Sequence, residues 1–472
     1  MWLMEKIKGV IRRMISAIDV QKAAKTDIAI SDKMQSAIRL WGEMYTGSPP
    51  WLDDNVKSLN LPAAIASEIA RLVTIEMESE VTGSARATYL NEQYRPVVQD
   101  ARRYVEYGCA KGGLALKPYI DGKDIIVDYV QADCFFPTAF DGKGNITGAI
   151  FTEQKNVGRK VYTRIELHQL VDTGYKIQNS AYESEDAAVL GRPVPLAEVE
   201  DWAELEPEVA IANIDRPLFA YFRIPQANTI DTRSPLGVSV YARAVGLIEE
   251  ADRQYGRILW EYEGGELAID ASASLYRKNQ KTGKFELPKG KERLFRIFEG
   301  MSDGSDDQLR EWAPTLRDTS LFNGLNQLLM KIEDTCGLAR GTFTDPQGEA
   351  KTATELKILR QRSYATVTDT QKAWQDAMEQ LVYAMDVWAT IGSLAPSGAY
   401  EVNSKYDDSV LMDIDAQRAL DIQDVRDGIM AKWEYRVKYM GEDEATAKRM
   451  VAEAQKDSGG GEESLPFGGG DG

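Results

Sequence analysis

The chain of 472 residues is poor in the side chains on which most metal and thiol chemistry depends, since it has one histidine and three cysteines. Cys109, Cys134 and Cys336 are odd in number and far apart, with no Cys-x-x-Cys pair. Neither a disulfide framework nor a zinc site is therefore expected, and a reducing cytoplasm fits this cysteine usage best. His168 lies in an alternating, strand-like run, where a lone histidine is usually structural, so it is assigned no role.

Sequence motifs of the common enzyme classes are also missing. There is no G-x-x-x-x-G-K-[ST], which a nucleotide-hydrolysing motor would need, no H-E-x-x-H and no helix-opening G-x-G-x-x-G after a strand. The densest acidic cluster, Asp303, Asp306 and Asp307, lacks the spacing of a calcium loop, and a solvated turn is the favoured interpretation. The sequence predicts no catalytic residue, no metal site and no cofactor.

Long apolar runs are absent as well. No stretch approaches the roughly 18 consecutive apolar residues that a membrane span requires, so no crossing is predicted. Residues 1–20 have apolar side chains on one helical face and lysines and arginines on the others, without the uninterrupted apolar core of a signal peptide. A helix packed on its own protein or on a neighbouring subunit is favoured over one that lies on a membrane surface.

The charge balance is acidic: 74 aspartates and glutamates against 56 lysines and arginines give a formal net charge of −18. This argues against a protein that grips nucleic acid through its phosphates, although it allows a surface past which DNA slides. Apolar residues make up 43% of the chain and charged residues 28%, as in a folded soluble protein. At this length we expect two to four structural regions.

The first half of the chain predicts an α+β domain over residues 1–234. Helices are expected where apolar residues recur at three and four, and strands where β-branched and aromatic residues alternate or cluster. The helices are 34–45, 61–82 and 91–108; the strands are 114–119, 124–130, 146–153, 161–170, 175–178 and 218–224. Residues 193–207 are expected to form an acidic surface insertion.

Long helices are predicted after Pro235. The first covers about 28 residues, or roughly 40 Å, and ends at Gly264 and Gly265. The remaining elements are strands at 267–276 and 294–298, a helix at 318–337, a Gly- and Pro-containing loop at 341–352, a helix from Thr352 or Thr354 to about 391, a strand at 401–406, a helical region at 415–455 and a disordered tail at 458–472. Trp374 and Trp388 both fall on the stripe of the longest helix that is expected to be buried.

Two stretches carry a resemblance to a known family. Gly348–Leu356, GEAKTATEL, is similar to the start of the long helix in portal proteins of Gram-positive-type siphophages, and Asp415–Arg436 is similar to the acidic helix and Gly-Ile-Met-Ala-Lys-Trp pattern of their crown. The order of elements along nearly the whole chain also resembles phage portal proteins. The resemblance implies a predominantly helical α+β fold that assembles as a ring. Its regions would be the wing at 1–234, a first stem helix at 235–263, the clip at 264–316, a second stem helix at 317–340, a tunnel loop at 341–352, a long wing helix and return strand at 353–406, the crown at 407–457 and a disordered tail at 458–472.

The resemblance also implies a role without enzymatic activity. A homo-oligomer, commonly of twelve subunits, would form the channel at one capsid vertex in the virion, after synthesis in the host cytoplasm. Its partners would be terminase, a head-tail adaptor, the major capsid and scaffolding proteins, and double-stranded DNA that passes without sequence-specific binding. The residues implied to lie near the DNA are Arg340, Gly341, Thr344, Asp345, Gln347, Glu349 and Lys351. Arg340 and Lys351 are the candidate phosphate contacts, with ordinary salt bridges as the alternative.

Two other functions remain open at this point. The first is a self-assembling capsid scaffold or adaptor without DNA passage. The second is a metal-dependent nucleic-acid-processing enzyme, which would have to use Asp303, Asp306 and Asp307 without an ancillary histidine or lysine. A ring with a hole wide enough for a duplex, about 20 Å or more, would distinguish the portal from both.

Overall fold

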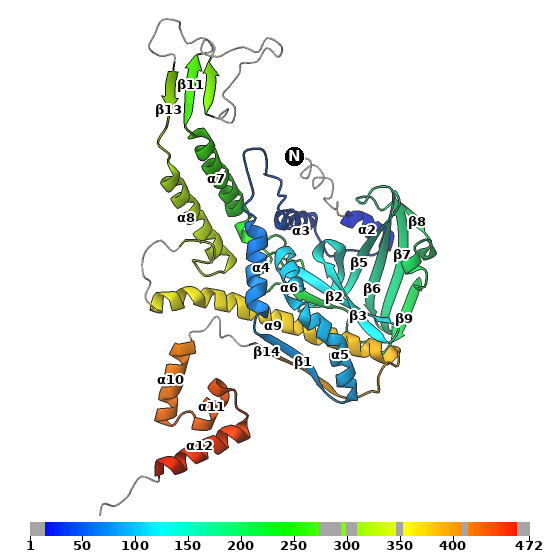
Figure 1. Ribbon diagram of the computed structural model, residues 1–472. Helices are drawn as coiled ribbons and strands as arrows, with labels where there is room; N and C mark the ends of the chain where they lie inside the picture. Colours follow the sequence, from blue (N-terminus) through cyan, green and yellow to red (C-terminus); the bar gives the residue numbers. More distant parts are fainter. Residues whose placement is uncertain (1–14, 273–293, 299–308, 346–352, 407–413, 460–472) are drawn as a thin grey trace, which may run out of the picture. The chain divides into compact units, whose positions relative to one another are not determined.

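A computed structural model describes most of the chain and divides it into two units, Met1–Tyr406 and Asp407–Gly472 (Figure 1). The described residues are 15–272, 294–298, 309–345, 353–406 and 414–459. The acidic cluster at 303–307 and residues 460–472 of the predicted tail therefore fall outside them. The tail was predicted to begin at Ser458, which is wrong, because Ser458 and Gly459 still belong to helix α12 (Glu444–Gly459). Within the described residues, no helix is both long and apolar enough to cross a membrane.

The first unit begins with helices, as expected, but two of their predicted bounds are wrong. The helices are α2 (Ala17–Ala24), α3 (Asp32–Tyr45), α4 (Leu61–Thr74), α5 (Ala85–Gln99) and α6 (Ala101–Lys111). The predicted helix 61–82 ends at Thr74, because Met77–Gly83 forms strand β1 and pairs antiparallel with β14 (Tyr400–Tyr406). The predicted helix 91–108 is the end of α5 and most of α6, which meet at Asp100.

Two antiparallel sheets follow, and every predicted strand of this region is present. The six-stranded sheet has the order β4-β5-β6-β7-β8 with β9 paired to β7, and the three-stranded sheet has the order β10-β2-β3. Their bounds are β2 (Gly113–Asp121), β3 (Asp124–Gln131), β4 (Phe135–Phe140), β5 (Ile146–Val157), β6 (Lys160–Val171), β7 (Gly174–Ser184), β8 (Arg192–Val194), β9 (Glu208–Ala212) and β10 (Ala220–Arg223). Strands β4, β8 and β9 were not predicted, and all three are short.

The expected acidic insertion at 193–207 is tied to the six-stranded sheet. It contains two 3-10 turns, Leu196–Glu198 and Glu200–Trp202. Leu196, Val199 and Trp202 are buried in one cluster with Tyr162 of β6. The insertion is therefore acidic on its surface but anchored by apolar side chains.

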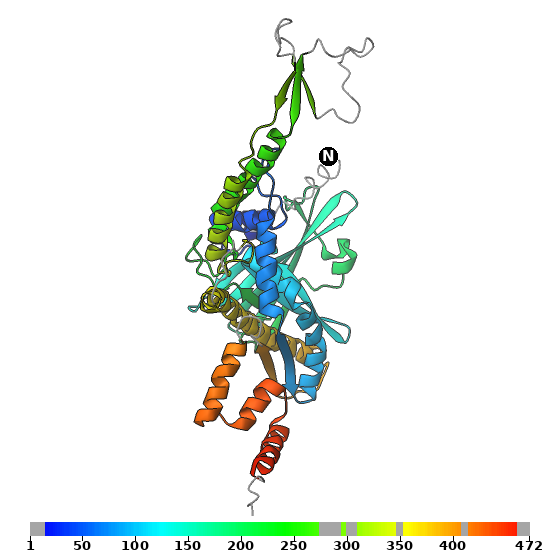
Figure 2. The same ribbon diagram turned by 60° about the vertical axis from the view of Figure 1, so that its left-hand side comes forward.

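A helix pair and a small sheet come next (Figure 2). Helix α7 (Val245–Gly264) has 20 residues, fewer than expected, because Tyr241 lies before it in a non-helical conformation and donates its hydroxyl hydrogen bond to Trp41 O. Helix α8 (Asp318–Cys336) lies beside α7, and Arg317 pairs with Glu261 at 2.7 Å. The sheet has the order β12-β11-β13, made of β11 (Ala268–Ser272), β12 (Phe295–Phe298) and the unpredicted β13 (Leu309–Trp312).

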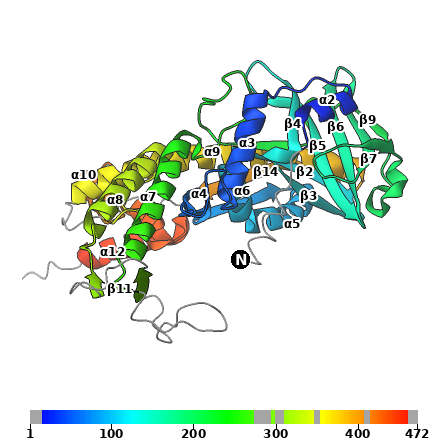
Figure 3. The same ribbon diagram turned by 90° about the horizontal axis from the view of Figure 1, so that it is seen from above.

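Helix α9 (Ala353–Ile391) has 39 residues and runs from the α7–α8 pair toward the six-stranded sheet (Figure 3). Its expected bounds are confirmed. Trp374 is buried and meets Phe222 of β10 edge-on at 5.1 Å between ring centroids, whereas Trp388 is half-buried. At its C-terminal end the buried Arg86 of α5 pairs with Asp386 at 2.6 Å. Helix α9 thus connects the N-terminal helices with the six-stranded sheet and with the three-stranded sheet β10-β2-β3.

The second unit has three helices, α10 (Ile414–Asp427), α11 (Lys432–Met440) and α12 (Glu444–Gly459). These helices confirm that the region 415–455 is helical, as expected. It is interrupted at Gly428 and Gly441, whose φ angles of 77° and 66° lie in the left-handed region that favours glycine.

Candidate functional site

The segment that follows α8 is a turn-rich loop held by its own helix. Helix α8 ends at Gly337, which is left-handed with a φ of 74°. A second left-handed glycine, Gly341, turns the chain again with a φ of 94°. A side chain at Gly337 would meet the Thr366 hydroxyl of α9 at 2.3 Å, so this turn needs glycine for space as well as for conformation.

Glu333 is the anchor of this loop. Glu333 is fully buried. Its Oε1 accepts hydrogen bonds from the backbone N–H groups of Phe343 at 2.6 Å and Thr344 at 3.0 Å. Its Oε2 accepts from the Gly341 N–H at 3.3 Å and from the Thr344 hydroxyl at 3.0 Å. A carboxylate that accepts several backbone hydrogen bonds fixes a loop strongly, because the buried Thr344 and the half-buried Phe343 would otherwise lose the acceptor of their N–H groups. One side chain therefore binds three of the four residues 341–344.

Two further contacts hold the ends of the loop. Arg340 is exposed and forms a two-pronged ion pair with Asp334, with distances of 2.7 and 3.1 Å. The hydrogen bonds to Asp334 raise the pKa of Arg340. Asn326 and Asp345 are joined by two hydrogen bonds, of 3.2 Å from the Asp345 N–H and 3.3 Å to the Asp345 carbonyl.

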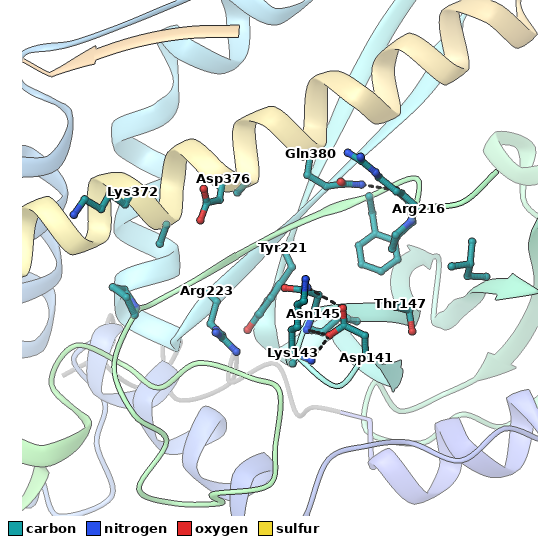
Figure 4. Close-up of a pocket in the computed structure, with 18 of the residues that line it drawn as sticks. Asp141, Lys143, Asn145, Thr147, Arg216, Tyr221, Arg223, Lys372, Asp376 and Gln380 are labelled. Atoms are coloured by element: carbon teal, nitrogen blue, oxygen red, sulfur yellow. Dashed lines mark hydrogen bonds between the residues drawn. The ribbon is translucent and has the colours of Figure 1, made fainter. Parts of the chain in front are cut away.

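A second candidate is an open cleft of about 950 Å³ beside α9 (Figure 4). One wall is α9 with Lys372, Asp376 and Gln380, and the opposite rim is the turn between β4 and β5. The charged lining residues are four basic ones and four acidic ones, namely Lys143, Arg216, Arg223 and Lys372, and Asp141, Asp215, Asp369 and Asp376. Such a balanced lining is unlike the continuous cationic groove with which proteins hold nucleic acid.

The rim of the cleft is rigid. Asp141 accepts hydrogen bonds from the backbone N–H groups of Lys143 and Asn145, each at 2.8 Å, and from the Asn145 amide at 2.9 Å (Figure 4). These bonds, first of all the one from the Asn145 backbone, lower the pKa of Asp141. On the opposite wall Gln380 donates to the Pro217 carbonyl at 2.7 Å.

Comparison with known families decides what kind of protein carries these features. The model of the family "Phage portal protein, SPP1 Gp6-like" matches residues 97–460. The chain belongs to this family of phage portal proteins. Portal proteins of this family are structural components of phage particles, with a connector role, and not enzymes. The resemblance noted in the sequence is thereby confirmed.

Two other comparisons add little. No curated protein sequence matches the chain. Among solved structures, a chain of the "Neck of native GTA particle computed with C12 symmetry" is similar at 10% identity with a TM-score of 0.41, over 89% of this chain and 98% of that one.

The structure places only part of the DNA-proximal set implied by the sequence. Gly341, Thr344 and Asp345 lie in the described loop with Arg340 at its start, whereas Gln347, Glu349 and Lys351 lie outside the described residues. Thr344 is buried, so it shapes the loop and does not face outward. Arg340 makes the salt bridge that was the alternative to a phosphate contact.

Sequence reasoning missed Glu333 and its neighbour Asp334. One signal was available: Glu333 adjoins Ile332 and lies one turn before Cys336, and both of these residues belong to a buried apolar stripe on α8. A carboxylate beside such a stripe needs buried donors. In the described part of the chain, no group of three histidine, cysteine, aspartate or glutamate residues could hold a metal ion.

His168 is buried in β6, as expected, within a cluster of charged side chains between the sheets. Its Nε2 lies 2.7 Å from Glu166 Oε1, and its Nδ1 lies 2.9 Å from the Tyr175 hydroxyl. An ionised carboxylate only accepts, so Nε2 donates to it. Because burial disfavours the imidazolium, the ring is neutral and Nδ1 accepts from the tyrosine hydroxyl. The other oxygen of Glu166 pairs with Lys117 at 2.5 Å and Arg164 at 3.2 Å.

The environment shifts the pKa of both acid-base groups of this cluster downward. Burial is the largest influence on each. For His168 burial lowers the pKa because it disfavours the imidazolium. For Glu166 burial alone would raise the pKa, but Lys117, His168 and Arg164 together hold it well below its usual value. The portal protein therefore keeps an ionised carboxylate and a neutral histidine buried at its six-stranded sheet.

Proposed function

We propose that this portal protein forms a closed ring of twelve identical subunits around an axial channel at one vertex of the capsid. DNA enters through this channel during packaging, is retained by it and leaves through it at ejection. Terminase and then a head-tail adaptor dock on the ring, and the major capsid and scaffolding proteins surround it. The observation that carries the proposal is the family match over residues 97–460.

The regions of the chain are assigned roles within this ring. Residues 1–234 and 353–406 form the wing, α7 and α8 form the stem, and residues 264–316, which include the small sheet, form the clip at which terminase and adaptor dock. Residues 341–352 form the tunnel loop, and 407–457 form the crown. The element order supports this assignment, because α7 and α8 flank the small sheet and are held together by the Arg317–Glu261 pair.

Exposed apolar side chains on the stem support assembly. Trp260 on α7 is 66% exposed and Phe322 on α8 is 47% exposed. Large apolar side chains that are exposed on both helices of a pair are expected to be buried by a partner. In a ring, the two neighbouring subunits contact both sides of each stem and shield these side chains from water. Tyr262 on α7 is exposed as well, and in the adjoining clip the exposed side chains are Leu267, Trp312 and Leu316.

The tunnel loop is proposed to face the DNA. Because Arg340 is already neutralised by Asp334, the described loop offers the duplex no strong cationic contact, which suits a surface past which DNA must slide. Lys351 is the second candidate phosphate contact. The rigid anchor at Glu333 supports this role, since a loop that borders a narrow channel has to keep its shape.

The ring is tested by mass photometry and electron microscopy of the purified full-length chain. We expect particles of near-twelvefold symmetry with an axial hole of about 20 Å or more, wide enough for a duplex. A uniform monomer or compact dimer at several salt concentrations would contradict the proposal, and closed particles without a hole would favour a scaffold or adaptor.

A further inference from the structure

The C-terminal unit has almost no apolar core of its own. Of the side chains described in it, Ala447 is the only buried hydrophobic one. Five of its large apolar side chains are exposed, among them Leu420 at 53% and Ile429 at 76%; the five are Leu420, Ile422, Ile429, Val437 and Met440. A unit of this size needs buried apolar surface to stay folded, so these side chains need a partner.

The orientation of α10 within the unit is fixed by one buried carboxylate. Asp421 is 4% exposed and accepts hydrogen bonds from Lys438 Nζ at 2.6 Å and the Tyr439 hydroxyl at 2.7 Å, both on α11. Successive residues of an α-helix are turned by about 100°. With Asp421 facing α11, Leu420 and Ile422 point to the two opposite flanks of α10.

The two flanks carry opposite charges. Asp424 and Asp427 stand one and two turns beyond Leu420, on the same flank. Arg426 stands one turn beyond Ile422, on the other flank, and Asp427 and Arg426 are exposed. We call the first the acidic flank (Leu420, Asp424, Asp427) and the second the basic flank (Ile422, Arg426). Among the side chains of α10 that the structure describes, those of 418–427, each flank therefore has an apolar centre with charges of one sign beside it.

We propose that α10 is a contact between neighbouring copies of this chain, in which the acidic flank of one copy packs against the basic flank of the next. This inference rests on the ring proposed above. A head-to-tail contact of two different surfaces closes a ring, and opposite charges beside an apolar centre fix which surface meets which. A foreign protein on one flank would leave the other flank uncovered, whereas a row of identical copies covers both.

The contact is tested first by a cysteine pair in the full-length chain. Leu420→Cys and Ile422→Cys in the same chain bring a thiol to each flank, and they cannot bond within one helix because they point apart. Under mild oxidation the double variant is expected to give a ladder of covalent oligomers up to the whole ring on a non-reducing gel. Either single variant, and the unmodified chain with its three native cysteines, should give none.

A charge reversal provides the second test, read out by hydrogen exchange of the α10 amides in assembled particles. Asp427→Arg or Arg426→Asp alone should raise this exchange roughly tenfold, because like charges then face one another at every contact. The double reversal restores the pairing and should return exchange to that of the unmodified ring. Restoration cannot result from a merely misfolded unit.

These outcomes separate the two proposals. If the unmodified chain forms no rings by mass photometry, the proposed function fails. If rings form but the cysteine pair gives no ladder, or both single reversals exchange like the unmodified ring, the α10 contact is overturned and another partner covers the flanks.

Discussion

Replacing Glu333 by alanine is expected to release residues 341–344 and to lower the free energy of unfolding by roughly 3 kcal/mol. The carboxylate accepts the N–H groups of Gly341, Phe343 and Thr344 and the Thr344 hydroxyl, and Thr344 is itself buried. Alanine would remove the acceptor of the buried Thr344 and the half-buried Phe343, whereas the N–H of the exposed Gly341 keeps the Thr344 hydroxyl as an acceptor at 2.9 Å. The amides of 341–344 should then exchange hydrogen far faster, while those of α9 stay protected.

Two matched variants give this prediction its controls. Glu333→Gln keeps one acceptor oxygen and should have an intermediate effect. Asp334→Ala changes the adjacent carboxylate, which pairs with the exposed Arg340, and should cost less than about 1 kcal/mol. Equal exchange of 341–344 in Glu333→Ala and in the unmodified chain would show that the carboxylate does not anchor the loop.

Replacing Glu166 by glutamine is expected to destabilise the first unit, Met1–Tyr406, by about 3 to 5 kcal/mol. The change removes the charge that Lys117 and Arg164 face at 2.5 and 3.2 Å, and these cations are themselves almost buried. Breaking one side of a buried ion pair is costly because it leaves the other charge uncompensated. Glu153→Gln is the matched control on the neighbouring strand: its carboxylate is 40% exposed, and its loss should cost less than about 1 kcal/mol.

The unmodified chain and Glu166→Gln should differ in how the free energy of unfolding depends on pH, because the pKa of Glu166 is lowered in the folded chain. A carboxyl with a lowered pKa in the folded state contributes stability above its unfolded pKa, near 4.5, and loses it as the pH falls through the folded pKa. The difference in unfolding free energy between the unmodified chain and Glu166→Gln should thus be constant at neutral pH and shrink below about 4.5. Chemical denaturation across this range checks it, and a difference that grows toward acid would contradict the ion cluster.

The fold could be predicted wherever one periodicity dominated a long segment. The 39 residues of α9 were delimited closely because apolar residues from Val367 to Trp388 hold helical spacing throughout. Residues 77–83 were wrongly joined to α4, since their strand conformation depends on pairing Met77 with Tyr406, more than 300 positions away. Such a long-range pairing overrides local propensity and leaves little trace in a single sequence.

The position of the candidate loop along the chain could be predicted from the sequence, but the contacts that hold the loop could not. The Gly- and Pro-containing loop after α8 is visible in the sequence, and its position in the portal family is implied by the GEAKTATEL stretch. That Glu333 holds the loop depends on the conformation of Gly341 and Thr344, which only the folded backbone reveals. The two flanks of α10 likewise became distinct only when Asp421 was seen to face α11.

The most direct test of the central claim is a photo-crosslink between the tunnel loop and DNA in filled particles of the phage that encodes this chain. A photoreactive residue is placed at Thr342 or Gln347 of the loop, and for comparison at the exposed Val157, at the end of β5. After irradiation and nuclease digestion, DNA should remain attached to the subunit in both loop variants, and not in the Val157 variant or in empty particles. Labelling of Val157 alone, or none in DNA-filled particles, would contradict a channel lined by this loop.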